Sequence, residues 1–246
     1  MVTAVAASTP IVARKPIQIV TRTKSTDRRF RMLLYGQAGI GKTTFGYKCH
    51  SSAGKSLIIA SERGYDFLGD VDVVDVGEWR DFTDAIDQLP LGDYETTVVD
   101  NLLSLADMVQ FSVCKTMGIT HPGDLDRGKA YDQIGLLAGV WFHKLSQKAR
   151  NIIWTCPERS MQVKSAAGIS VVRVMPDAPT STLRIVLNGV EFVGHAEEGK
   201  GGQRTINFVP SQDREAKDRK GLVKGGVFPL DGRAFYDLVT ANAVGE

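Results

Sequence analysis

The sequence has few cysteines and histidines, and it lacks long apolar runs. Its three cysteines are odd in number and far apart, so we expect buried small side chains in a reducing compartment rather than a disulfide framework. The four histidines are scattered without metal-ligand spacing. Apolar runs stay well below the ~18 residues of a transmembrane helix. These features predict a soluble cytoplasmic protein that does not interact with membranes.

The composition predicts a single globular domain. The chain has 246 residues, of which 43% are hydrophobic and 24% are charged, enough for one sizeable core. Glycine is frequent (25) and proline modest (9), which is typical of an α/β protein with many short connections. We predict a weakly structured N-terminal arm over residues 1–27, one domain over 28–240 and a tail over 241–246.

Charge is unevenly distributed along the chain. The formal net charge is only +2. Seven basic residues and one acid lie in Arg14–Arg31, thirteen acids and two arginines in Glu62–Asp107, and seven basic residues and three acids in Lys200–Lys224. Basic segments around an acidic middle are consistent with binding of a polyanion such as nucleic acid. Clusters of solvated surface charge explain the same pattern, and both interpretations stay open.

Strand and helix patterns alternate from residue 30 to residue 156. Continuous apolar runs predict strands over residues 30–36, 55–62, 94–101 and 150–156. Helical spacing of apolar residues predicts helices over 42–52, 78–89, 102–117 and 130–145. Strands that are apolar throughout indicate a parallel sheet covered on both faces.

The pattern changes after Cys156. Residues 157–181 are polar and contain glycine, which predicts a mobile loop or a small excursion from the fold. Residues 190–210 read as two strands joined by a glycine-rich turn, which predicts an antiparallel hairpin added to the sheet.

The stretch "GQAGIGKT" fits the pattern of a phosphate-binding loop. It follows a predicted strand and opens a predicted helix, which is the context that this motif requires. Backbone N–H groups of such a loop surround phosphate oxygens at the positive end of the helix. Lys42 would neutralise the β- and γ-phosphates, and the Thr43 hydroxyl would bind Mg²⁺. The predicted ATP-binding residues are Gly36, Gln37, Ala38, Gly39, Ile40, Gly41, Lys42, Thr43 and Thr44.

Two acids at predicted strand ends are candidates for the remaining chemistry. Asp100 ends the apolar run 94–101, as expected for the carboxylate that holds Mg²⁺ through water. Many oligomeric ATPases place a catalytic glutamate directly after this aspartate, but here the next residue is Asn101. Glu62 ends the preceding strand and would face the same crevice, so we predict that it activates the attacking water. A solvent-exposed loop glutamate is the alternative.

These residues resemble the RecA-like ATPases, which carry a glutamate and then a lone aspartate at these two strand ends. More closely, the chain resembles phage nucleotide-binding proteins that include ATP-dependent single-strand annealing proteins. The resemblance rests on "YGQAGIGKTTF", "IIASERG", "DYETTVVDNLLSLADMV", "NIIWTCPERS" and "REAKDRKG", which extend from Phe30 to Gly221. It implies a RecA-like P-loop NTPase core, a mostly parallel sheet flanked by helices.

The resemblance also implies further site residues. The segment Arg159–Thr182 would lie where recombinases contact single-stranded DNA, with Arg159, Lys164 and Arg173 as phosphate contacts; a flexible surface loop is the alternative. Lys217 and Arg219 would reach the γ-phosphate of a neighbouring subunit in an oligomer, or else form a solvated charge run. One position departs from the family pattern. Pro157 stands where a polar sensor is expected, and Thr155 or Glu158 could replace it.

Together these features predict a phage-type ATPase that hydrolyses ATP with Mg²⁺ and acts on single-stranded DNA in recombination or annealing. The alternative is an ATP-dependent switch or loader that acts on a replication protein, such as a single-strand binding protein, with little DNA binding of its own. A small-molecule kinase is a third reading, although no arginine-dense lid segment lies between the third and fourth predicted strands.

Overall fold

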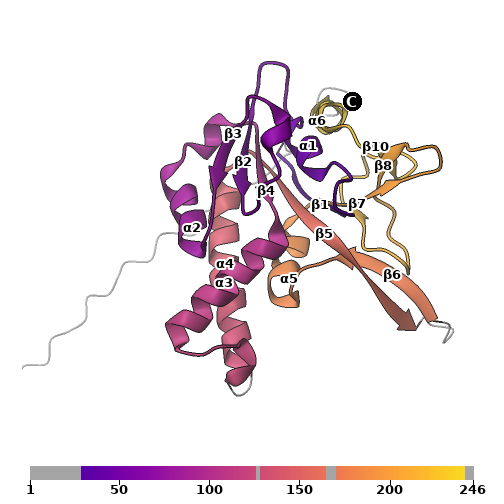
Figure 1. Ribbon diagram of the computed structural model, residues 1–246. Helices are drawn as coiled ribbons and strands as arrows, with labels where there is room; N and C mark the ends of the chain where they lie inside the picture. Colours follow the sequence, from indigo (N-terminus) through magenta and orange to yellow (C-terminus); the bar gives the residue numbers. More distant parts are fainter. Residues whose placement is uncertain (1–28, 126–127, 165–169, 242–246) are drawn as a thin grey trace, which may run out of the picture.

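The computed structural model describes residues 29–125, 128–164 and 170–241. The predicted arm (1–27) and the last five residues of the predicted tail lie outside this part of the chain. The fold is α/β (Figure 1). Its strands are β1 (Arg31–Gly36), β2 (Ser56–Ala60), β3 (Asp72–Asp75), β4 (Thr96–Asp100), β5 (Asn151–Lys164), β6 (Ser170–Pro176), β7 (Phe192–Glu198), β8 (Arg204–Asn207), β9 (Lys217–Asp218) and β10 (Val227–Pro229).

The strands form one sheet with the order β10-β8-β7-β1-β5-β4-β2-β3, in which β6 pairs with β5 and β9 with β7. The strands from β7 to β3 along this order are parallel to one another. The additions β6, β8, β9 and β10 are antiparallel to their partners. The predicted fold class is therefore confirmed, including the C-terminal hairpin, which is β7–β8.

Helices cover both faces of the sheet. They are α1 (Lys42–Tyr47), α2 (Trp79–Gln88), α3 (Leu102–Met117), α4 (Lys129–Lys148), α5 (Thr180–Gly189) and α6 (Gly232–Ala241). Alternate residues of each parallel strand enter opposite cores because side chains alternate along a strand. Leu33 and Tyr35 of β1 face α2–α5, whereas Met32 and Leu34 face α1 and α6.

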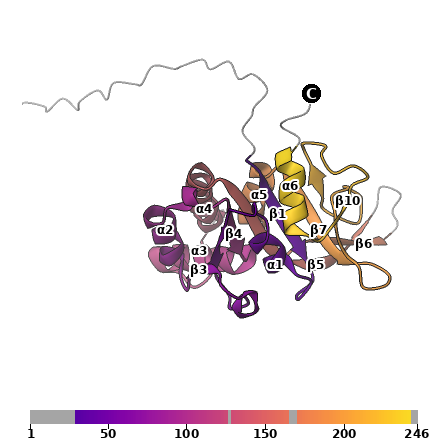
Figure 2. The ribbon, with the colours of Figure 1, turned by 90° about the horizontal axis from the view of Figure 1, so that it is seen from above.

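The close packing of α6 on α1 depends on a glycine. A Cβ atom at Gly232 would lie 2.0 Å from the carbonyl oxygen of Phe45, so any larger residue would push the two helices apart. Phe235, one turn further along α6, is fully buried against Phe30, Phe45 and Phe192. The C-terminal helix is thereby fixed beside α1 (Figure 2).

For the segment after Cys156, the sequence left open a mobile loop and a small excursion from the fold, and the structure shows the excursion. Residues 157–181 are not a mobile loop over their described part, because β5 continues through Lys164 and pairs with β6 from Glu158↔Pro176 to Lys164↔Ser170. The two strands leave the sheet as a long antiparallel hairpin (Figure 1). The strands and α-helices absent from the sequence prediction are β3, β6, β9, β10, α5 and α6.

One helical region would be long enough and apolar enough to cross a membrane by composition alone. It spans Leu102–Asp124, with a mean hydropathy of 1.2. Core helices of soluble proteins meet the same criteria. Leu105, Val109 and Val113 of α3 pack in the main core against α4 and the sheet, and 33% of the apolar window is buried.

Candidate functional site

The predicted site residues meet at the carboxyl edge of the parallel strands. Strand β1 ends at Gly36, and β2 and β4 end side by side at the pair Ala60↔Asp100. Strand β5 passes Gly36 at Pro157 before it continues into the hairpin. Side chains that follow these strands therefore surround one crevice, as expected for an open α/β sheet.

A cavity of about 450 Å³ occupies this crevice. Its walls come from the glycine loop and α1, from the segment after β2, from the end of β4, and from β5 and β8. The residues are Ala38, Gly39, Gly41, Lys42, Thr43, Thr44, Glu62, Arg63, Gly64, Phe67, Asp100, Asn101, Pro157 and Arg204. The structure thus brings together the loop and both predicted acids.

The loop has the geometry of an anion-binding turn. Gly41 precedes α1 with φ +109°, a conformation that residues with a Cβ rarely adopt. The Lys42 ammonium donates to the carbonyl oxygens of Gly36 and Gln37, both at 2.8 Å, which holds the side chain across the loop. Burial lowers the pKa of Lys42, while the Asp100 carboxylate raises it. A phosphate group would add negative charge beside this partly buried ammonium and stabilise its charged form.

Asp100 contacts Thr43, the other residue that is predicted to hold Mg²⁺. The Thr43 hydroxyl donates to Asp100 Oδ2 at 2.7 Å, and the Thr155 hydroxyl donates to Oδ1. A hydroxyl and a carboxylate oxygen in contact are suitable oxygen ligands for Mg²⁺, which otherwise keeps several waters. Among the described residues, no group of three or more His, Cys, Asp or Glu side chains forms a separate metal site. Mg²⁺ would therefore be held by Thr43, Asp100 and the phosphates.

Glu62 lines the cavity from the segment that follows β2. Its side chain is exposed and accepts a hydrogen bond from the Ser104 hydroxyl at the start of α3. Asn101, in the position that many ATPases fill with glutamate, instead caps α3 by accepting from the Ser104 N–H at 3.0 Å. Glu62 is therefore the acid that lines the cavity beside Asp100, as predicted.

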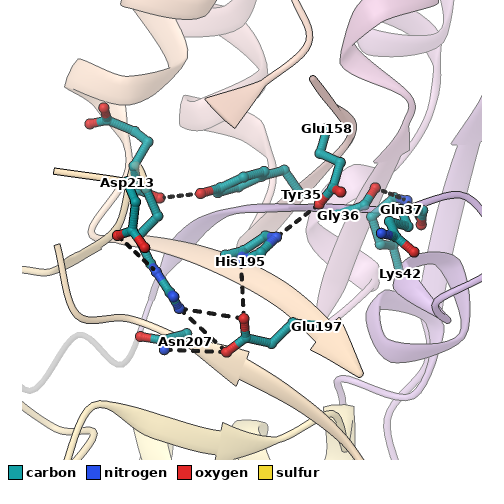
Figure 3. A network of polar contacts seen from close by, with 11 residues as sticks. Tyr35, Gly36, Gln37, Lys42, Glu158, His195, Glu197, Asn207 and Asp213 are labelled. Atoms are coloured by element: carbon teal, nitrogen blue, oxygen red, sulfur yellow. Dashed lines mark hydrogen bonds and ion pairs between the residues drawn. The ribbon is translucent and has the colours of Figure 1, made fainter. Parts of the chain in front are cut away.

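Thr155 and Glu158, the two candidates for the polar sensor, occupy different places. Thr155 is fully buried and donates to Asp100, so it positions that carboxylate. Glu158 lies between the loop and His195 (Figure 3). The His195 ring is buried, stacks on Tyr35 at 4.9 Å between ring centres, and its Nε2 lies 2.8 Å from Glu158 Oε2.

The polar network continues from His195 towards the hairpin. His195 Nδ1 lies 3.6 Å from Glu197, which accepts from Arg214 at 3.3 Å (Figure 3). The segment that contains Arg214 also contacts β6, because the Val174 N–H donates to the Asp213 carbonyl at 2.7 Å. A chain of direct contacts therefore runs from Glu158, at the base of the hairpin in β5, through His195, Glu197 and the Asp213–Arg214 segment to Val174 in β6.

The three predicted DNA contacts lie on this hairpin but not on one face. Residues paired directly across an antiparallel ladder share a face, so Arg159 and Arg173 lie on one side and Lys164 on the other. Arg159 and Lys164 are exposed. Arg173 already has a partner within the protein, because its partly buried guanidinium donates to Glu215 at 2.6 Å.

Lys217 and Arg219, the two predicted trans-acting residues, lie near the amino end of β7, away from the carboxyl edge that carries the cavity. Lys217 pairs with Val193 near the start of β7, and its ammonium donates to the Leu187 carbonyl at 2.6 Å. Burial lowers the pKa of Lys217. Lys217 therefore has a hydrogen-bond partner within its own subunit. The Arg219 side chain, in contrast, is exposed.

Sequence reasoning missed Arg204, Arg63 and Phe67. All three line the cavity, and Phe67 is 68% exposed. Arg204 follows the glycine-rich turn after β7. The sequence pattern predicts this turn as a hairpin connection and does not indicate that Arg204 lines a cavity. Its approach to the loop depends on the pairing of β8 with β7, which no local pattern reports.

The fold and this site define a P-loop nucleotide-binding protein. A parallel sheet carries the loop, lysine and threonine after β1, and at the end of β4 an aspartate that contacts the threonine. Residues 28–220 match the family model of the AAA domain, so the chain belongs to the AAA-domain family of P-loop ATPases. No curated protein sequence matches the chain.

Replacing Asp100 by Asn should raise the Mg²⁺ concentration needed for half-maximal ATPase activity by about 10- to 100-fold, because partners of metal ligands have effects of this size. The amide keeps the shape of the side chain but removes its charge. A Mg²⁺ titration of the steady-state rate measures the effect. The control is Asp93→Asn, which changes an exposed aspartate shortly before β4. The Mg²⁺ dependence of its ATPase rate should match that of the wild type. Unchanged Mg²⁺ dependence in Asp100→Asn would remove Asp100 from the metal site.

Proposed function

We propose that this protein hydrolyses ATP with Mg²⁺ in the cytoplasm and uses the cycle to act on single-stranded DNA, as phage recombination and annealing proteins do. The observation that carries the proposal is the continuity of β5. The same strand passes Gly36 at Pro157 and then forms the projecting hairpin. An element that touches the ATP site and extends into solvent can couple nucleotide state to a ligand bound outside.

The composition of the hairpin supports a polyanionic ligand. Its described residues, Glu158–Lys164 and Ser170–Pro176, include three basic side chains and one acid, and the acid is turned to His195. Met161 and Val172 are 44% and 55% exposed, which offers apolar contact to unstacked bases. Aromatic side chains are absent from these residues, so stacking of the kind found in many single-strand binders is not part of the proposal.

In the proposed mechanism, each group in the cavity has one role. Lys42 and the loop N–H groups neutralise and orient the phosphates. Asp100 and Thr43 would hold Mg²⁺, which would supply positive charge to the phosphate oxygens. Glu62 accepts a proton from the attacking water as the water oxygen bonds to the γ-phosphorus, while the bond to the β–γ bridging oxygen breaks and ADP leaves. The Glu158–His195–Glu197–Arg214 contacts transmit the change in phosphate occupancy to β6.

Self-association is part of the proposal, with Arg219 as the residue that reaches a neighbour. Arg219 lies beside the start of β7, and the seven residues of β7 separate it from the carboxyl edge by roughly 20 Å. It cannot serve the cavity of its own subunit. A cation near a neighbour's γ-phosphate would stabilise the charge that develops during transfer. Lys217 is better explained as a partner of α5.

The DNA contacts can be tested through salt dependence. Changing Arg159 and Lys164 together to Ala should reduce the slope of log K against log salt by about 1.4, since each phosphate contact to a single strand contributes ~0.7. Fluorescence anisotropy with a labelled oligonucleotide, across a salt series and with ATP present, measures the slope. The pair Lys55→Ala and Arg80→Ala removes two exposed cations from β2 and α2 and should leave the slope unchanged.

Two results would count against the DNA proposal. An unchanged slope in the hairpin variant would place any DNA contact elsewhere on the surface. Absence of single-strand binding by the wild type at low salt, with ATP present, would favour an ATP-dependent switch that acts on a replication protein.

A further inference from the structure

A groove between α4 and α5 lies apart from the phosphate cavity and shares no lining residue with it. Its volume is about 290 Å³. Much of its lining is apolar, because buried side chains of α4, α5 and β5 contribute to it: Phe142, Ile152, Trp154 and Val186. A groove of this size suits one or two branched apolar side chains rather than a drug-sized ligand.

Two glycines leave the groove open. A Cβ atom on Gly139 of α4 would lie 3.7 Å from Ile185 Cδ1 of α5, so a larger side chain at this position would enter the space between the two helices. A Cβ atom on Gly189, at the end of α5, would have no neighbour within 4 Å. At these two positions, therefore, neither helix fills the groove with a side chain of its own.

The groove lies at the amino edge of the parallel strands, beside the start of β1. Arg31, the first residue of β1, lines the groove and donates to the Ser146 carbonyl of α4 at 2.9 Å. Its neighbour across the sheet, Ile152 of β5, also lines the groove. The described chain begins two residues before Arg31, at Arg29. The 28 residues that precede Arg29 are therefore joined to the fold next to this groove.

The sequence of these preceding residues has the pattern of a tethered docking segment. Residues 21–28, TRTKSTDR, are all polar, whereas Pro16–Val20, PIQIV, carries three branched apolar side chains. Eight residues can span up to about 30 Å, which is ample for a groove that Arg31 itself lines. In an extended segment, Ile17 and Ile19 would point to the same side because side chains alternate.

We propose that the segment Pro16–Val20 docks in the groove between α4 and α5 of its own chain, with Ile17 and Ile19 as the apolar anchors. A short polar tether gives such a segment an effective concentration on the order of 1 mM at the groove. A contact with a dissociation constant of about 0.1 mM would then be formed in roughly nine molecules out of ten. The tether thus favours the chain's own segment over that of a second copy. The inference requires neither ATP nor DNA and is independent of the proposed function.

Docking would restrain the helix that follows the β5–β6 hairpin. Strand β6 ends at Pro176 and α5 begins at Thr180, so the hairpin returns to the sheet through α5. A segment that contacts α4 and α5 together would hold α5 against the main core. The N-terminal segment would thereby steady the base of the projecting hairpin.

Disulfide trapping in the full chain tests the contact. Ile17→Cys places a thiol on the segment, and His143→Cys places another on an exposed position that lines the groove. The three native cysteines are buried, so they should not compete. With a mild oxidant, this pair should form an intramolecular disulfide about tenfold faster than the pair Ile17→Cys and Lys144→Cys, because docking raises the local thiol concentration. Lys144 is the next residue of α4, but it pairs with Asp87 of α2 and does not line the groove.

Further changes in the first cysteine pair show whether the anchors and the groove matter. Ile19→Ser removes an anchor, and Gly139→Leu fills the groove. Each should slow disulfide formation about threefold, because loss of one branched apolar contact weakens docking by about 30-fold. Val5→Ser is the control within the N-terminal residues. Gly135→Leu is the control on α4, since a Cβ there lies 4.0 Å from the Ser181 carbonyl oxygen and outside the groove.

Intact-mass measurement and a non-reducing gel separate the outcomes. A disulfide within the monomer, slowed by Ile19→Ser and Gly139→Leu but not by their controls, is the expected result. Equal rates for the two cysteine pairs, or a rate that neither Ile19→Ser nor Gly139→Leu changes, would overturn the inference. Disulfide-linked dimers whose formation slows on dilution would assign the groove to a second copy and overturn the intramolecular contact. Ile19→Ser decides the result if Gly139→Leu does not fold, because residue 19 precedes the described fold.

Discussion

Lys42→Ala protein should bind ATP and turn it over about 10²-fold less well than the wild type, or worse. The partly buried ammonium is held at the loop by the Gly36 and Gln37 carbonyls, and burial lowers its pKa. Removing a preorganised cation from such a site leaves the phosphate charge without compensation. Calorimetric titration with ATP and the steady-state rate measure the two effects.

Lys55→Ala is the matched control for this change. Lys55 is exposed just before β2, pairs with Asp72 at 3.0 Å and does not line the phosphate cavity. Its loss should leave both ATP affinity and turnover at wild-type values. Wild-type binding and hydrolysis by Lys42→Ala would refute the assignment of the loop as the phosphate site.

Glu62→Gln should keep ATP affinity within about twofold of the wild type and lower kcat by about 10²-fold or more. A general base acts on the proton that leaves the water in the transition state, and it contributes little to binding of the ground state. Gln preserves the size of the side chain and can still contact the Ser104 hydroxyl, so the wall of the cavity should keep its shape.

The control for Glu62 is Asp66→Asn, four residues later in the same segment. Asp66 is exposed in a short helical turn and does not line the cavity. The Asp66→Asn change should therefore leave kcat unchanged. A Glu62→Gln protein with the wild-type rate would place the general base elsewhere, and a large loss of ATP affinity would instead make Glu62 a binding residue.

The core of the site could be predicted from the sequence because its residues follow strand ends. In a parallel sheet, every strand delivers its last residues to the same edge, so Lys42, Glu62 and Asp100 converge without knowledge of the strand order. Local chemistry supports each position: a glycine loop before a helix, and acids after apolar runs. The structure confirms this convergence in one cavity.

The hairpin was missed because its stability comes from pairing between distant segments. Residues 157–181 are polar and contain prolines, which obscures the alternation of Met161 and Val163 with polar neighbours in β5. That alternation was the available signal for a strand. Similarly, the spacing of Leu183, Val186 and Val190 could have indicated α5, whose apolar side enters the main core.

Arg204 and His195 could not be identified from sequence because their roles depend on strand order. His195 reaches Glu158 only because β7 and β5 both flank β1. Arg204 reaches the loop only because β8 pairs with β7 and because Leu230 holds its backbone. A single arginine or histidine after a strand carries no such information by itself.

The coupling of ATP hydrolysis to single-stranded DNA is the central claim of this account. The most direct test is the steady-state ATPase rate of the wild type, measured with and without single-stranded DNA across a salt series. We predict stimulation by DNA at low salt that disappears as salt rises, because phosphate contacts are lost through counterion competition. An ATPase rate that is the same with and without DNA at every salt concentration would contradict it.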